Sequence, residues 1–214
     1  MPHLSPASLN TLERLVTERG ALLTRDDIIQ AGLHPRVLSQ AVEAGELERV
    51  QRGVYLAPNG SLRSHAELRE LSLRVPGAVV CLRSALSFHG LTTSQPLEIS
   101  LAITRRARAP QISFPPVHFY RFSDSAFLHG IERITEARGS YPIPVYSPEK
   151  TLADLLKYRH KIGLDLFLEG LTTYFRRDRE RKPDLNALQV AARICQVEKL
   201  MHTYTQLLSV DTGT

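Results

Sequence analysis

Cysteine is scarce in this sequence, and long apolar runs are absent. Cys81 and Cys195 lie far apart and outside any CxxC or Cys/His spacing, which predicts ordinary buried thiols rather than disulfides or a zinc site. No apolar run approaches the roughly 20 residues that cross a bilayer. The first residues, MPHLSPASLN, lack the charged and apolar regions of a signal peptide. We therefore expect a cytoplasmic protein that does not associate with membranes.

The sequence also lacks the common signatures of enzymes. It contains no G-x-S-x-G elbow and no Walker or dinucleotide-binding glycine pattern. Its eight histidines are scattered without metal-ligand spacing. One charged cluster suggests nuclease chemistry, but its spacing does not bring its members to one helical face, so we interpret it as structural. We expect no catalytic activity, cofactor or metal, with a nuclease as the weaker alternative; the cluster is Glu149, Lys150, Asp154 and Lys157.

Positive charge is in excess overall but not at the N-terminus. The formal net charge is +5, which favours a polyanionic partner. Residues 1–60, however, hold six arginines and seven acidic residues, whereas residues 61–214 hold 21 basic and 15 acidic residues. DNA binding by the N-terminal segment therefore depends on where its few arginines lie.

The first 58 residues predict three helices followed by a β-hairpin. Ser5 is a suitable N-cap for the first helix, and Gly20 ends it. Thr24 and Asp27 form a capping-box pattern at the start of the second helix, in which Ile28 and Ile29 are expected to point inward. The third helix begins at about Pro35. Its apolar stripe is Val37, Leu38, Ala41 and Val42, and its outer side chains are Arg36, Ser39, Gln40 and Glu43.

The hairpin GELERVQRGVYLAP follows the third helix directly, an order typical of a winged helix-turn-helix. In that motif the second helix of the pair enters the major groove and reads base edges with its early residues. Here those residues are His34, Arg36, Ser39 and Gln40; arginine pairs with guanine, glutamine with adenine, and serine with a base or a phosphate. A winged fold used only for protein contacts is the alternative, and both interpretations stay open.

Pro58-Asn59-Gly60 marks the expected boundary, and a helix over residues 61–75 follows with Arg63, Arg69 and Arg74 on its outer face. AVVCL predicts a buried strand and RSALSFHGL a short helix. Further strands are expected at 97–105, 117–122 and 142–147, while HGIERITEA fits either a strand or a helix. SPEKTLADLLKYR and LDLFLEGLTTYF predict two amphipathic helices. Residues 184–208 predict one long helix whose heptad seam fits either dimerisation or packing within the domain; the seam is Ala187, Val190, Ile194, Val197, Met201, Tyr204 and Leu208.

These elements predict an α+β protein with three parts. Residues 1–58 are expected to form the winged helix-turn-helix domain and residues 59–77 a linker helix. Residues 78–214 are expected to form a mixed α/β domain with strands preceding a helical bundle.

Two basic clusters lie in the second part of the chain. The first follows a predicted strand and consists of Arg105, Arg106 and Arg108; the alternatives for it are phosphate contacts or a solvated surface. The second lies within residues 176–182, is diluted by Asp178 and Glu180, and is better explained as a solvated loop.

Three blocks in this order resemble the AbiEi family of antitoxins, the transcriptional-regulator partners in type IV toxin–antitoxin systems. The blocks are LTRDDIIQAGLHPRVLSQAVEAGELERVQRGVYLAP, VVCLRSALSFHGL and VYSPEKTLADLLKYR. The resemblance implies a winged helix that binds the protein's own promoter and represses its operon. It also implies a C-terminal antitoxin domain that counters an AbiEii-like nucleotidyltransferase toxin without a stable complex. Carried onto this sequence, the promoter contacts fall on Arg25, Arg36, Ser39 and Gln40, with wing contacts from Arg49, Gln51 and Arg52. Thr24, at the start of the second helix, is a further candidate for a DNA contact.

The leading hypothesis is therefore a sequence-specific DNA-binding repressor, with its own promoter as the double-stranded DNA partner. Because the first 60 residues are net acidic, we expect the basic second domain to help hold the DNA. The competing hypothesis is a protein-interaction module that binds a partner protein without specific DNA binding. The sequence leaves the oligomeric state open.

Overall fold

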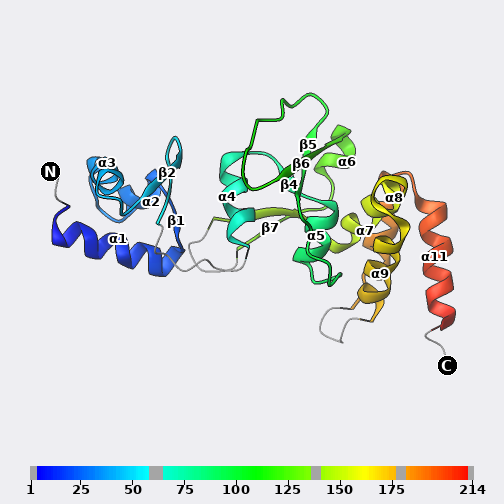
Figure 1. Ribbon diagram of the computed structural model, residues 1–214. Helices are drawn as coiled ribbons and strands as arrows, with labels where there is room; N and C mark the ends of the chain where they lie inside the picture. Colours follow the sequence, from blue (N-terminus) through cyan, green and yellow to red (C-terminus); the bar gives the residue numbers. More distant parts are fainter. Residues whose placement is uncertain (1–3, 58–64, 136–140, 177–181, 212–214) are drawn as a thin grey trace. The chain divides into compact units, whose positions relative to one another are not determined.

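The computed structural model describes residues 4–57, 65–135, 141–176 and 182–211, and it is a mixed α+β structure (Figure 1). The chain divides into two compact units. The first consists of Met1–Pro76 with Ile134–Pro142, and the second of Gly77–Arg133 with Ile143–Thr214. The predicted boundary at Pro58-Asn59-Gly60 lies outside the described residues.

The first unit begins with three helices and a small sheet. All three predicted helices and the hairpin are present, and a short strand that the sequence analysis missed pairs antiparallel with the second strand of the hairpin. The sheet order is β1-β3-β2. The elements are α1 (Pro6–Arg19), β1 (Leu22–Thr24), α2 (Arg25–Gln30), α3 (Arg36–Glu43), β2 (Glu48–Gln51) and β3 (Val54–Leu56).

The helix starts follow the capping residues. The Ser5 hydroxyl accepts a hydrogen bond from the Ser8 amide, and Thr24 and Asp27 form the predicted capping box. The predicted inward position of Ile29 is wrong: its side chain is 47% exposed, whereas Ile28 is fully buried. Because α2 is short, it presents only one residue to a core that α1, β1 and α3 already fill.

The helix α4 (Ala66–Arg74) occupies part of the predicted 61–75 helix; residues 58–64, with Arg63, lie outside the described residues. Leu68, Leu71 and Val75 are buried as expected. The outer position predicted for Arg69 is wrong, because that side chain is only 4% exposed. The helix therefore buries more of its circumference than a single amphipathic stripe.

The second unit is built on a five-stranded sheet of order β6-β5-β4-β8-β7. β4 pairs antiparallel with β5 and parallel with β8, while β5 and β6 run parallel from Ile99↔Val117 to Thr104↔Phe122. The segment HGIERITEA, unassigned from the sequence, supplies β7. The strands are β4 (Val79–Val80), β5 (Ile99–Thr104), β6 (Val117–Phe122), β7 (Ile131–Ile134) and β8 (Ile143–Tyr146).

Helices of the second unit enclose α7, which packs against α5, α9 and α10 and is buried along most of its length. Leu152, Leu155 and Phe167 are fully buried in this core. The helices are α5 (Leu82–Phe88), α6 (Asp124–Leu128), α7 (Pro148–Lys157), α8 (Arg159–Ile162), α9 (Leu164–Phe175), α10 (Leu185–Ile194) and α11 (Glu198–Asp211).

The single long helix predicted for residues 184–208 is wrong. The chain breaks into α10 and α11 at Gln196, whose φ of 63° lies in the left-handed region. The break turns Val197 and Met201 into the core of the same unit. The apolar repeat therefore reflects packing within the unit, while Val190 remains 38% exposed.

Candidate nucleic-acid interface

The helix α3 separates an apolar face from a polar face. Val37, Leu38 and Ala41 are buried against α1 and α2, because apolar residues recur at helical spacing. Arg36 and Ser39 are exposed and Gln40 is partly exposed on the other side. The exposed polar face predicted from the sequence is therefore present, free of the core and open to a partner.

The entry to α3 is shaped by His34. Its Nδ1 accepts a hydrogen bond from the Arg36 amide at 3.2 Å, and its carbonyl accepts one from the Val37 amide at 2.9 Å. The imidazole is exposed. His34 therefore positions the helix start, and only its Nε2 edge is left to contact a ligand.

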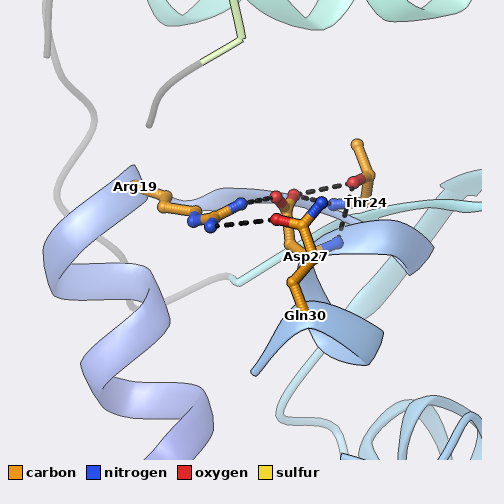
Figure 2. Close-up of polar contacts among 4 residues, drawn as sticks. All are labelled: Arg19, Thr24, Asp27 and Gln30. Atoms are coloured by element: carbon orange, nitrogen blue, oxygen red, sulfur yellow. Dashed lines mark hydrogen bonds and ion pairs between the residues drawn. The ribbon is translucent and has the colours of Figure 1, made fainter. Parts of the chain in front are cut away.

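A polar network fixes α2 to α1 (Figure 2). The Thr24 amide and hydroxyl both donate to Asp27 Oδ2 at 2.7 Å, and the Asp27 amide donates back to the Thr24 hydroxyl at 3.2 Å. Arg19, at the end of α1, donates to Asp27 Oδ1 and to Gln30 Oε1. The Thr24 hydroxyl proton is therefore committed to the cap, although the sequence placed Thr24 among the DNA contacts.

The hairpin is anchored to α2 through its turn. The Arg25 amide donates to the Gly53 carbonyl at 2.9 Å, and Gly53 has a φ of 82° that suits a glycine at this turn. A register shift between Arg49 and Gln51 marks a bulge in β2. Arg49 and Arg52 are exposed, whereas the side chain of Gln51 lies outside the described part of the chain. α2, α3 and the hairpin thus form one connected assembly.

This assembly carries balanced charge. Its exposed arginines are Arg25, Arg36, Arg49 and Arg52, and its exposed acids are Asp26, Glu43, Glu46 and Glu48. The arginines sit at the starts of α2 and α3 and on the hairpin, as the sequence indicated.

The Arg105–Arg108 turn belongs to the second unit. Arg105, Arg106 and Arg108 are exposed directly after β5. The Arg121 guanidinium on β6 donates to the Arg105 carbonyl at 3.0 Å and to the Ala107 carbonyl at 2.7 Å. The turn is thus held by a fourth arginine, which the sequence analysis did not single out.

The charged cluster on α7 contains a buried ion pair. Lys150 Nζ lies 2.5 Å from Asp154 Oδ2, both side chains are fully buried, and the ammonium lies 4.3 Å from the centre of the Tyr146 ring. The expectation that the cluster does not converge is wrong for these two residues, because an i, i+4 spacing places them on one helical face. Lys157 instead faces solvent, and Glu149 accepts a hydrogen bond from the Tyr174 hydroxyl at 2.5 Å.

The two cysteines flank this ion pair as buried thiols. The Cys195 thiol donates to Asp154 Oδ1 at 3.2 Å. Burial raises the pKa of Cys195 to about 12 and the pKa of Cys81 well above its ordinary value, and the nearby Asp154 carboxylate adds to both shifts. Burial also raises the pKa of Asp154, while Lys150 opposes that shift.

Sequence reasoning missed Arg19 and Arg121, which shape these regions, and it also missed the pairing of Lys150 with Asp154. Nothing in the sequence pointed to Arg19, since its partners lie on another helix. The pairing of Lys150 with Asp154 was visible as an i, i+4 spacing within an apolar helix.

Among the residues described, no three His, Cys, Asp or Glu side chains gather in a way that could hold a metal ion. No described helix has the length and apolar character needed to span a membrane.

One known protein is similar to this chain in fold, and a known family matches its N-terminal segment. The crystal structure of the RV2827C protein from Mycobacterium tuberculosis is similar, with a TM-score of 0.54 and 18% sequence identity over 96% of this chain and 82% of that chain. At this identity the likeness concerns the fold alone. No curated protein matches the chain. The family described as "Transcriptional regulator, AbiEi antitoxin" matches residues 10–58, so the resemblance to AbiEi proteins is confirmed for the segment that contains α3 and the hairpin.

Proposed function

We propose that the protein is a transcriptional repressor that binds DNA through a winged helix-turn-helix within residues 4–57. The observation that carries the proposal is the polar face of α3, which lies beside an arginine-bearing hairpin inside the segment that matches the AbiEi family. In a helix-turn-helix, a helix in this position enters the major groove. The bound DNA is the protein's own promoter.

Each exposed side chain has a chemical role in this proposal. Arg36 pairs with a guanine edge and Gln40 with an adenine, while Ser39 contacts a base or a phosphate. His34 contributes its free ring edge. Arg25 and the wing residues Arg49, Gln51 and Arg52 contact phosphates or the minor groove. Thr24 acts through the cap that fixes α2, by holding Asp27.

The charge balance of the first unit explains why a second contact is needed. On α2, α3 and the hairpin, the charges of four exposed arginines are balanced by those of four exposed acids, so the non-specific attraction of these elements to DNA is weak. Arg105, Arg106 and Arg108 form an exposed turn that supplies phosphate contacts without reading sequence. The second unit also acts as the antitoxin, by antagonising an AbiEii-like nucleotidyltransferase toxin. We propose no catalytic role for the chain.

The exposed acids support one alternative, a module that binds a partner protein through the same elements. Two measurements separate the alternatives: binding of the full chain to its own upstream promoter fragment, and capture of the product of the neighbouring gene. Specific, saturable binding to the promoter over an unrelated duplex supports the repressor. Capture of the neighbouring protein without promoter binding supports the interaction module.

A further inference from the structure

A second surface, on the other unit, combines rings with positive charge. We propose that this surface binds single-stranded nucleic acid by stacking unpaired bases on its rings and pairing its cations with the phosphates. We call it the α8 patch: His118, Tyr120, Tyr158, Arg83, His160 and Lys161.

The rings of the α8 patch form a row from β6, at the edge of the sheet, to the start of α8. The His118 and Tyr120 rings have centroids 4.6 Å apart, and the Tyr120 and Tyr158 rings meet edge to face at 5.6 Å. The His118 side chain is 58% exposed, and the two tyrosines are partly buried against the core. The row therefore runs from a solvent-exposed ring to rings that the core holds in place.

The cations of the patch lie around this row, together with one exposed acid, Glu98, whose carboxylate lies 3.9 Å from His118 Nδ1. The sequence from Lys157 to Ile162, KYRHKI, contains no acid. α8 has four residues, so its side chains originate within about 6 Å along the helix axis. The Arg83 guanidinium of α5 donates to the Ile162 carbonyl, which brings a further charge to the same turn. Burial raises the pKa of Tyr120, and nearby Cys81 and Glu98 add to that shift while Arg83 opposes it.

Rings and cations together fit a single strand better than a duplex. Unpaired bases stack on aromatic side chains while a basic surface follows the phosphates. In a duplex the base faces are stacked on each other and unavailable to such rings. An acidic protein would use the cations but would leave the row of rings without a partner.

The test uses the full-length protein and the fluorescence anisotropy of labelled oligonucleotides of about 12 nucleotides, oligo(U) RNA and oligo(dT) DNA. A duplex of unrelated sequence and a labelled polyglutamate are measured in parallel. We expect saturable binding of one or both single strands, and weaker binding of the duplex and of polyglutamate. Equal binding of polyglutamate, or no single-strand binding at about 100 mM salt, would overturn the proposal.

Variants at His118 separate stacking from charge. His118→Ala removes the ring and should weaken oligonucleotide binding about five- to a hundredfold, whereas His118→Phe keeps a ring and should retain binding. Lys161→Ala should reduce the slope of log K against log salt by about 0.7, and Lys199→Ala, an exposed lysine on α11, should not change it. Loss of binding in both His118 variants, or in neither, would contradict the stacking role. The site is separate from α1, so Arg14→Ala, which removes an exposed arginine of that helix, should leave oligonucleotide binding unchanged.

Discussion

The buried ion pair on α7 gives a sharp prediction about stability. Asp154→Leu leaves the Lys150 ammonium buried without its carboxylate, and it removes the acceptor of the Cys195 thiol. Removing one partner of a buried pair costs about 3–5 kcal/mol. The double variant Lys150→Met with Asp154→Leu replaces both charges by apolar groups of similar size, and such replacements are often close to neutral.

The size of the expected destabilisation follows from the full burial of Lys150 and Asp154. Both side chains have 0% exposure, so water cannot screen the stranded charge. For a chain of this length, each kcal/mol shifts Tm by about 2–4 °C. Asp154→Leu should therefore lower Tm by roughly 6–20 °C, while the double variant should recover most of the loss.

The pH dependence of Lys150→Met supplies an internal check. Burial already raises the pKa of Asp154, and removing Lys150 raises it further. A carboxyl group whose pKa is raised by folding destabilises the protein as pH rises above its unfolded pKa, because the unfolded state then releases the proton more readily. The loss of stability should thus be larger at pH 8 than at pH 5.

Thermal and urea unfolding of the four proteins measure these effects. Single variants within about 2 °C of the wild type, which is less than 1 kcal/mol, would refute the claim that the pair is desolvated. A double variant as unstable as Asp154→Leu would refute the claim that the stranded charge causes the loss. The same result bears on the nuclease alternative, since loss of a cleavage activity in an Asp154 variant would follow from unfolding alone.

Three further predictions concern other parts of the molecule. Burial raises the pKa of Cys195 to about 12 and that of Cys81 above its ordinary value, so a thiol reagent at pH 8 should label neither in the folded protein and both in urea. Because the unfolded thiols ionise first, the free energy of unfolding should fall as pH rises above about 8.5; a constant value would contradict the burial. Asp27→Ala removes the carboxylate half of the capping box, which accepts from the Thr24 amide and hydroxyl, together with the contact with Arg19, and should cost about 1–2 kcal/mol in urea unfolding, whereas the exposed neighbour Asp26→Ala should cost less. Neutralising the three arginines of the Arg105–Arg108 turn should flatten the slope of log K against log salt for promoter binding by up to about three; an unchanged slope would remove the turn from the interface.

Local signals predicted much of the fold. The hydroxyl of Ser5 and the Thr24–Asp27 pair give helix starts that depend only on neighbours in the chain, and both caps are present. β6 occupies the predicted residues 117–122. The polar side chains of α3 were also predictable, because the helical period separates them from the apolar stripe.

Features that depend on distant residues were not predictable in the same way. β1 is three residues long and exists as a strand because it pairs with β3. The helix breaks at Gln196 although the apolar repeat in the sequence continues through that position. The core that receives Val197 and Met201 is formed by helices distant in the sequence. The helical spacing predicts an outer position for Arg69, yet its side chain is buried in the folded chain.

The central claim is that α3 reads DNA sequence, and Arg36 tests it most directly. The measurement is the affinity of the wild type, Arg36→Ala and Arg14→Ala for the protein's own upstream promoter fragment; Arg14 is an exposed arginine on α1 and matches the change in charge. Arg36→Ala should lose about 1–3 kcal/mol of binding free energy and relax the preference at one base pair, while Arg14→Ala should retain wild-type affinity. Unchanged promoter binding by Arg36→Ala would contradict the assignment of α3 as the recognition helix.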